Sequence, residues 1–217
     1  MDWERHAERE EERYAEGLAR LPPDPDARQK QLVRVAMAAT GAGLARLMQG
    51  RRAEAAGWFS RSAERFRASH ADAPPGSWGR LIGAVKARVL ARDWDGAAQD
   101  ASWALDQLPA ESDSPIGRYA AVLALLVLGR DDEALVLAGG LRAEAESAFP
   151  GAVATALAGL AAGDGDLYGD AVGRVLVSFE ERDAHLEDVP VADTVIVLEA
   201  LAGRRGLAAG LTSPLLP

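Results

Sequence analysis

The sequence predicts an all-α protein of about ten helices, arranged as antiparallel hairpins that stack into an irregular tetratricopeptide-like solenoid. Three observations support this fold class. The chain of 217 residues is rich in Ala, Leu, Arg and Glu, which favour helix. Aromatic residues make up only 6 % of it, and the alternating pattern typical of strands is scarce. Pro and Gly recur at helix-length intervals, and the short loops between helices favour antiparallel neighbours.

Each expected helix is bounded by such breakers. The run from Pro22 to Pro25 ends the first helix, Gly50 ends the second, and a loop with Pro74 and Pro75 follows the third. The ten expected helices cover roughly residues 2–20, 26–49, 52–69, 77–91, 94–108, 115–129, 131–147, 151–162, 168–184 and 190–203.

Small residues recur at positions that match the tetratricopeptide pattern. In that pattern a Gly ends helix A, and Ala and an aromatic residue follow on helix B. The equivalent alanines are Ala55, Ala97, Ala134 and Ala171, the last after a three-residue insertion, and their spacings are 42, 37 and 37 residues. Small residues on helix B let helix A approach closely. The alternative is a non-repetitive helical domain in which these alanines coincide because Ala is common.

We expect one domain over residues 1–217, with three parts. Residues 1–25 form an N-terminal helix and a Pro-rich linker, and residues 26–189 form the stacked hairpins. Residues 190–217 form a helix that caps the stack and an apolar tail, 211–217, that packs back on it.

Charge is distributed unevenly around the net value of −9. Residues 1–27 carry nine acidic and four basic residues, whereas residues 28–92 carry 13 basic and three acidic ones. Residues 130–217 are again acidic, with 15 acidic and six basic residues. A basic middle between acidic ends bears on partners and solubility rather than on fold.

Composition excludes several classes of protein. Apolar residues make up 48 %, which argues against wholesale disorder. Cys is absent, which excludes disulfides, cysteine-ligated zinc and a thiol nucleophile. The charged N-terminus lacks the apolar core of a signal peptide, and no uncharged apolar run reaches the length of a membrane span. We therefore expect a cytoplasmic protein with no membrane partner.

No set of residues requires catalysis or a metal to explain it. Glu181 and His185 could share a metal if they lie one helical turn apart, but nothing supplies the remaining ligands, and a solvated helix end explains them as well. Asp164, Asp166 and Asp170 only loosely resemble a calcium loop, and helix capping explains them better. We predict no catalytic residue, no metal and no cofactor.

Acidic residues recur at three successive turns between a helix A and a helix B. They are Asp93, Asp95, Asp131, Asp132, Glu133, Asp164 and Asp166. In a stacked solenoid these turns fall along one edge, where an acidic ridge would speed association with a basic partner. The alternative is that each carboxylate only caps its own helix.

The basic stretch 28–92 has two interpretations. Nucleic-acid binding would need its arginines on one face with aromatic side chains for stacking. Trp58 and Phe59 are near but fit the repeat core, and the sequence pI is about 4.9, so we do not expect nucleic acid. The alternative is that the stretch docks the acidic N-terminal helix, with Trp3, Tyr14 and Leu18 supplying apolar contacts.

The C-terminal part resembles the immunity protein 49 family. The segment FEERDAHLEDVP (179–190) with the following helix VADTVIVLEALAGRRGL (191–207) looks like the end of that family, and AVLALLVLGRDDEALVLA (121–138) is similar to its middle. The resemblance implies an all-α, repeat-like protein of bacterial polymorphic toxin systems, which binds a cognate toxin domain and blocks it.

These expectations combine into one hypothesis of function and two rivals. The hypothesis is a non-enzymatic protein-binding module, an immunity protein whose acidic surface occludes a basic toxin domain. The first rival is a tetratricopeptide-type peptide-binding scaffold or regulatory protein, with a groove lined by Arg80, Arg88 and Arg118. The second is an enzyme that uses Glu181 and His185. The sequence leaves the oligomeric state and the interface anchors open.

Overall fold

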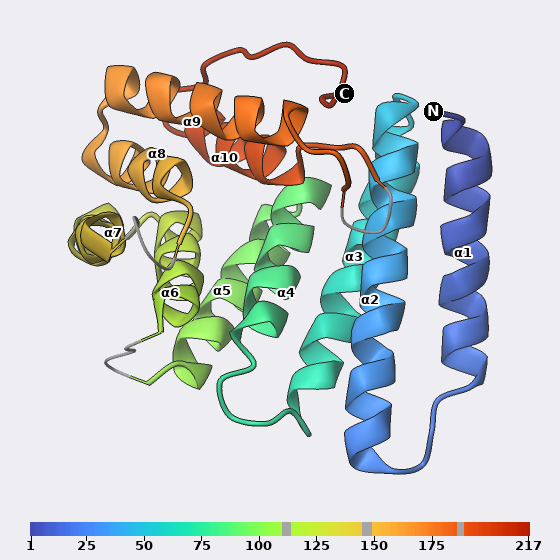
Figure 1. The fold of residues 1–217 in the computed structure, drawn as a ribbon. Coiled ribbons are helices and arrows are strands. Elements are labelled where there is room, and N and C mark those ends of the chain that lie inside the picture. The colour runs from blue at the N-terminus through green and yellow to red at the C-terminus, as the bar shows by residue number, and fades with distance from the viewer. Residues whose placement is uncertain (110–113, 145–148, 186–188) are drawn as a thin grey trace.

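A computed structural model describes all residues except 110–113, 145–148 and 186–188 (Figure 1). The described part contains ten α-helices joined by loops, and no strand. The predicted all-α class is therefore confirmed. The helices are α1 (Trp3–Ala19), α2 (Pro25–Met48), α3 (Arg52–His70), α4 (Trp78–Ala91), α5 (Trp94–Gln107), α6 (Pro115–Leu128), α7 (Asp131–Glu144), α8 (Gly151–Ala162), α9 (Gly165–Glu180) and α10 (Asp193–Gly203).

Each helix from α1 to α9 packs against its neighbours in the chain. In addition α4 contacts α6, and α6 contacts α8, so alternate helices also pack against each other in this part of the array. Helices α1, α2 and α3 stand side by side at one end, and α8, α9 and α10 lie across the other (Figure 1). No described helix is long and apolar enough to cross a membrane.

The expected helix limits agree with the structure to within one residue for most helices. The main difference is α9, which we expected at 168–184 but which begins at Gly165 and ends at Glu180. The Asp164 carboxylate accepts a hydrogen bond from the Leu167 amide at 3.0 Å, and this N-cap starts the helix three residues early. The predicted end of the seventh helix, 145–147, lies outside the described residues.

The turns that follow α2, α4, α6 and α8 share one backbone motif. In each, a residue with a left-handed conformation follows the first helix, and the next helix begins two residues later; these residues are Gly50, Arg92, Gly129 and Gly163. The following amide donates back to the carbonyl five residues earlier, as from Asp93 to Arg88 at 3.1 Å. This is the Schellman motif, which satisfies carbonyls that a helix end leaves unpaired.

The repeat alanines on α3, α5, α7 and α9 are all buried. Ala55, Ala97 and Ala134 occupy the same place, the fourth residue of their helices. Ala171 does not, because Tyr168 holds that place in α9 and the expected three-residue insertion is absent. A Cβ on Gly159 of α8 would lie 2.8 Å from the Tyr168 backbone nitrogen, so Gly supplies the close approach in this hairpin.

Two glycines of α2 allow its neighbours to pack closely. A Cβ on Gly41 would lie 3.0 Å from Cγ of Glu10 on α1, and one on Gly43 would lie 2.6 Å from the Phe59 ring on α3. The Gly41-Ala42-Gly43 sequence is therefore a packing feature in the middle of a helix.

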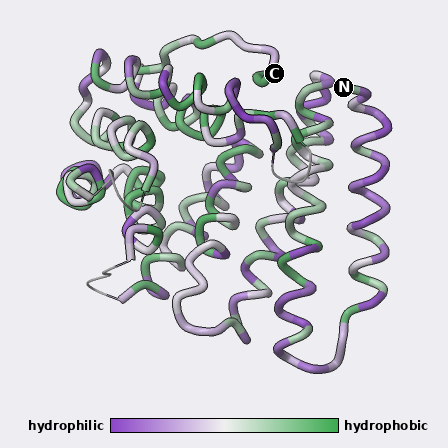
Figure 2. Tube along the Cα trace, viewed as in Figure 1, coloured by the Kyte–Doolittle hydropathy of each residue, from purple (hydrophilic) through white to green (hydrophobic). Residues whose placement is uncertain are grey.

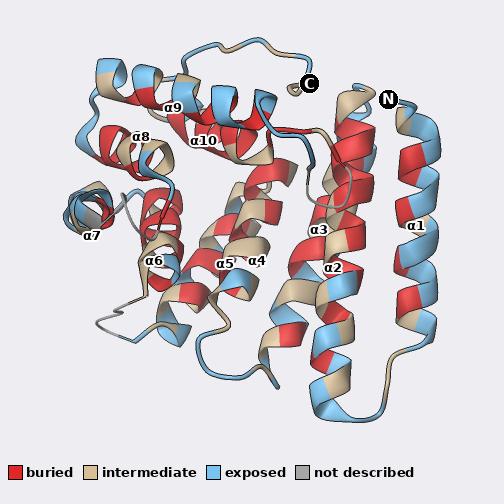
Figure 3. Cartoon of the chain, viewed as in Figure 1, coloured by how far each residue is buried: buried red, intermediate tan, exposed pale blue. Residues whose placement is uncertain are grey.

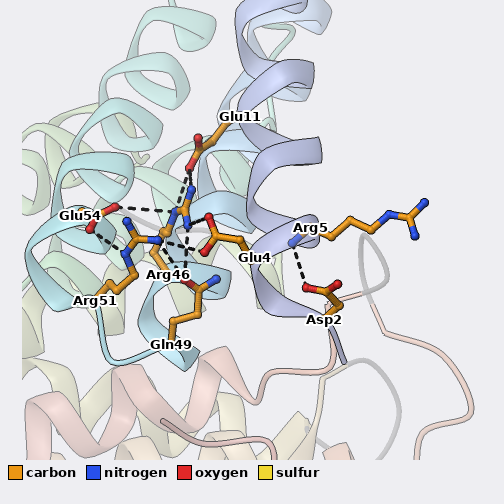
Figure 4. Close-up of polar contacts among 8 residues, drawn as sticks. All are labelled: Asp2, Glu4, Arg5, Glu11, Arg46, Gln49, Arg51 and Glu54. Carbon is orange, nitrogen blue, oxygen red and sulfur yellow. Dashed lines mark hydrogen bonds and ion pairs between the residues drawn. The ribbon is translucent and has the colours of Figure 1, made fainter.

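The acidic helix α1 docks on the basic stretch, as one of the two sequence interpretations predicts. Arg46 of α2 is 7 % exposed and donates to Glu4 at 2.7 Å and to Glu11 at 2.8 Å, and Arg51 adds a bond to Glu4 at 3.0 Å (Figure 4). Tyr14 is buried against Trp58, with ring centroids 5.3 Å apart, and Leu18 packs beside it. Trp3 packs against the main core.

The last helix and the tail close the other end of the array. Helix α10 contacts α8 and α9 but also reaches back to α4, so it crosses the array rather than only capping its end. Most of α10 is buried (Figure 3). The apolar tail packs back as predicted, with Leu211, Leu215 and Leu216 against the core and the Leu215 carbonyl accepting from the Ala192 amide at 3.0 Å.

Candidate functional site

The three acidic turns meet around one segment, residues 204–207. The Arg204 guanidinium lies over the Trp94 ring, 4.5 Å from its centroid, and donates to the Val127 carbonyl. Arg205 donates to Asp131 at 2.5 Å and to the Leu126 carbonyl at 2.7 Å. Leu207 lies against Gly165. The segment thus touches the α4–α5, α6–α7 and α8–α9 turns, which brings the predicted residues to one side of the molecule.

Four of the seven predicted acidic residues are engaged within the chain. Asp93 caps α5 through the Gly96 amide and pairs with Arg88 at 2.9 Å. Asp164 caps α9, as described above. Glu133 pairs with Arg130 at 2.6 Å, and that hydrogen bond lowers the pKa of Glu133. Asp131 is held by Arg205. The capping interpretation therefore holds for Asp93 and Asp164.

The other three acidic residues are exposed and uncommitted. Asp95, Asp132 and Asp166 each lie in the first turn of a helix, where the helix dipole favours a carboxylate. None of them forms an ion pair within the part of the chain that the structure describes. One such carboxylate comes from each of the three turns.

Arginines lie among these carboxylates and reduce the local negative charge. Arg88, Arg130 and Arg205 pair with predicted residues, Arg204 lies on Trp94, and Arg92 occupies the α4–α5 turn itself. The edge is therefore a mixed surface with three unpaired carboxylates, less acidic than the sequence alone suggests.

The arginines of the rival groove are partly engaged. Arg88 donates to Asp93 and to the buried Asp100, which also accepts from Arg67 at 2.6 Å. Arg80 donates to Gln29. These side chains are held by contacts within the chain.

The aromatic residues near the basic stretch are not a stacking surface. Phe59 is fully buried, and Trp58 packs on Tyr14 with Arg61 over its ring at 4.4 Å. Nucleic-acid binding through these residues gains no support from their placement.

The residues weighed for metal binding do not come together. Because α9 ends at Glu180, Glu181 and His185 do not share a helical turn. No group of three or more His, Asp or Glu side chains that could hold a metal ion occurs among the described residues. Glu187 and Asp188, which follow His185 in the sequence, both lie outside the described residues.

Sequence reasoning missed a hollow of about 510 Å³ between the two ends of the array. Its lining comes from α2, α3, α4, α6, α8, α9, α10 and some of the residues between them, and it is mostly apolar, with Met37, Leu44, Phe66, Ile82, Phe149 and Phe179 among its members. A hollow of this size falls in the range of small-molecule sites. No local motif marks it, because its lining residues are spread along the chain from Met37 to Thr194.

A half-buried ion pair sits in the wall of this hollow. Lys86 of α4 donates to Asp193 of α10 at 2.7 Å. Burial lowers the pKa of Lys86, but Asp193 and Tyr119 together raise it above its ordinary value. Burial raises the pKa of Asp193, but Lys86 and Thr194 together lower it below its ordinary value, so both groups stay charged at neutral pH. Burial also raises the pKa of the neighbouring Tyr119, so its hydroxyl keeps its proton.

Comparisons with known proteins give no family assignment. No protein-family model, no curated protein and no solved structure matched the chain.

Proposed function

We propose that the chain is a non-enzymatic protein-binding module that acts in the cytoplasm as an immunity protein. It binds a toxin domain with a basic surface and covers the cationic active site or substrate channel of that domain. The observation that carries the proposal is the set of exposed carboxylates of Asp95, Asp132 and Asp166, one from each turn around segment 204–207. The resemblance of residues 121–138 and 179–207 to immunity protein 49 supports the same function.

The surface suits binding that is steered by charge and then completed by contact. Unpaired carboxylates on a water-facing edge attract a cationic partner over about a Debye length, roughly 8 Å at physiological salt. Trp94 lies at the same edge, partly buried under Arg204, and aromatic and Arg side chains are the residue types that dominate binding energy.

The test is co-expression with each protein encoded beside this chain in its native genome. The proposal expects one neighbour to be toxic alone, harmless in the presence of this chain, and bound to it after purification. If none of the neighbours is toxic or bound, the immunity proposal is overturned.

The binding edge is tested by a triple variant, Asp95→Lys, Asp132→Lys and Asp166→Lys. We expect its association rate with the neighbour to fall at least about tenfold at low salt. The matched control reverses Glu8, Glu12 and Asp106, which are also exposed and make no ion pair in the described structure. Equal loss in both variants would mean that overall charge, and not this edge, directs binding. Asp131 is left intact because Arg205 needs it.

A peptide-binding scaffold remains the alternative function, with weaker support. The groove it needs is lined by helices α4, α6 and α8, and α10 already packs on α4 and α8. Arg88, a predicted peptide contact, is held by Asp93 and Asp100.

A further inference from the structure

The hollow between the two ends of the array is a site separate from the acidic turns. None of the seven predicted acidic residues lines the hollow. The hollow extends along α4 as far as Leu90, but it takes in the beginnings of α6 and α8, through Ile116, Tyr119 and Val153, whereas the acidic turns follow the ends of these two helices. It joins α2 and α3 on one side to α9 and α10 on the other, which lie at opposite ends of the array (Figure 1). A ligand here would contact both ends of the molecule.

Most of the wall offers only apolar contact. Met37, Leu44, Ile82, Val153 and Val175 supply aliphatic surface, and rings of Phe66, Phe149 and Phe179 complete it. Gly79 and Gly83 of α4 also line the wall; a Cβ at Gly79 would meet no atom within 4 Å, whereas Gly83 packs closely against the Phe66 ring. Such a surface binds a hydrocarbon body, because burying it removes apolar area from water on both sides.

The polar groups in the wall favour a hydrogen-bond acceptor. The Tyr119 hydroxyl makes no hydrogen bond in the described structure. Lys86 uses donors on Asp193 and, at 3.3 Å, on Thr194, and an ammonium group has three N–H donors in all. The Nδ1 atom of His185 is buried without a partner and can also donate when it carries the proton. Two or three donors thus face the hollow.

The charge balance of the wall favours an anion over a cation. Asp193 is the only carboxylate among the described lining residues, and Lys86 neutralises it. Arg182, an exposed lining residue, lies over the Phe179 ring with its guanidinium 3.7 Å from the ring centroid and adds a positive charge. A carboxylate would therefore meet charge-assisted donors, whereas an ammonium group would meet no free carboxylate among the described lining residues, because Lys86 already pairs with Asp193.

We propose that this hollow binds a medium-chain fatty acid, with the hydrocarbon chain against the apolar wall and the carboxylate near Tyr119 and Lys86. The fatty acid is bound there and undergoes no chemical reaction. This site does not depend on the proposed function, since it uses none of the residues at the acidic turns.

The test is calorimetric titration of the purified chain with decanoate, below the concentration at which decanoate forms micelles. We expect one molecule bound per chain. Decylamine tests the sign of the charge, and methyl decanoate tests whether a free carboxylate is needed; both should bind at least about tenfold more weakly, because a hydrogen bond to a charged group is lost. Absence of decanoate binding, or equal binding of all three compounds, overturns the proposal.

Two variants place the ligand in the hollow. Gly79→Phe inserts a ring at a lining position where a Cβ meets no atom within 4 Å, so the fold tolerates it while the hollow is filled. Gly57→Phe is the matched control, at an exposed helical glycine with the same open space outside the hollow. We expect decanoate binding to be lost in Gly79→Phe and retained in Gly57→Phe. If both variants still bind decanoate, the ligand binds outside the hollow and the assignment of the site is overturned.

A third variant tests the carboxylate position. Tyr119→Phe removes only the hydroxyl and should weaken decanoate roughly tenfold while leaving methyl decanoate nearly unchanged. A merely structural role of Tyr119 would weaken both compounds alike and would overturn this part of the proposal.

Discussion

Different interactions stabilise the two ends of the helix array. Every buried polar or charged side chain among the described residues lies between His6 and Asp100, including Glu10, Gln29 and Arg46. The described core of the later helices is built from Ala, Leu, Val and a few aromatic residues. Figure 2 shows the contrast, with a largely hydrophilic α1 and hydrophobic α8 and α10.

The difference separates specificity from stability. Charged groups in the α1–α2 contact fix which surfaces meet, but their desolvation offsets much of the attraction between them. Apolar burial in α6 to α10 stabilises at roughly 25 cal/mol per Å² and, unlike an ion pair, is not weakened by protonation or by the screening of charges. We therefore expect the later helices to resist acid and salt, and the α1–α2 contact to respond to both.

The largest expected effect comes from truncating the apolar core. Leu157→Ala removes a fully buried side chain of α8 and should lower the free energy of unfolding by about 3 kcal/mol at any salt concentration. Urea unfolding monitored by circular dichroism measures it. Val177→Ala, at a residue that is 48 % exposed, is the control and should cost less than about 0.5 kcal/mol. A salt-dependent cost at Leu157 would contradict the comparison.

The second effect removes the buried charge of the α1–α2 contact. Arg46→Met keeps much of the aliphatic stem but leaves Glu11 unpaired and Glu4 with only Arg51. It should cost roughly 2 kcal/mol, less than the loss of a fully buried pair, because both carboxylates regain some contact with water. Amide hydrogen exchange should show α1 opening first. Arg5→Met is the control, since the Arg5 side chain points away from the cluster (Figure 4). Unchanged exchange in α1 would show that apolar contacts alone hold it.

A third, smaller effect runs in the stabilising direction. Arg92 is the one described non-glycine residue with a positive φ, 59°, and takes the place that Gly50, Gly129 and Gly163 hold in the other turns. Arg92→Gly should raise the free energy of unfolding by about 1 kcal/mol, because it relieves the left-handed strain. Gly129→Arg, the reverse change, should lower it by a similar amount. Equal melting temperatures for all three proteins would refute the strain.

The smallest expected effect is on the pH dependence of stability. The hydrogen bond from Arg46 lowers the pKa of Glu4 below its ordinary value of 4.5. The contribution of this hydrogen bond to the free energy of unfolding is therefore fully present above pH 4.5 and is lost as the pH falls through the lower pKa of the folded state. Arg46→Met should flatten the fall in stability below pH 4.5, whereas Leu157→Ala should run parallel to the unmodified protein. Parallel curves for Arg46→Met would contradict the linkage.

The helices could be predicted because their limits are written locally. Pro22 to Pro25, Gly50, Gly129 and Gly163 break the chain through their own backbone preferences, and each marks a helix end in the structure. The docking of α1 was also predictable, since its charge is opposite to that of the stretch it contacts. The start of α9 was missed because the Asp164 cap, although local, was assigned to a turn.

The surface could be predicted only in part, because its charge depends on distant residues. Nothing near Asp131 in the sequence indicates that Arg205, 74 residues away, neutralises it. The hollow could not be predicted for the same reason, since Thr40, Lys86 and Asp193 come together in its lining only when both ends of the array have folded. The positions of the carboxylates at helix starts could be predicted from the helix limits, but whether each carboxylate is paired could not.

Segment 204–207 has a consequence for the order of events during synthesis. Hairpins such as α2–α3 form contacts between nearby residues and can assemble as soon as they leave the ribosome. Two of the three turns instead gain contacts from arginines that are synthesised long after them, because Arg204 must reach Trp94 and Arg205 must reach Asp131. Until those contacts form, the Trp94 ring and the Leu126 and Val127 carbonyls lack these partners. This edge of the nascent chain is therefore exposed while the later helices are being synthesised.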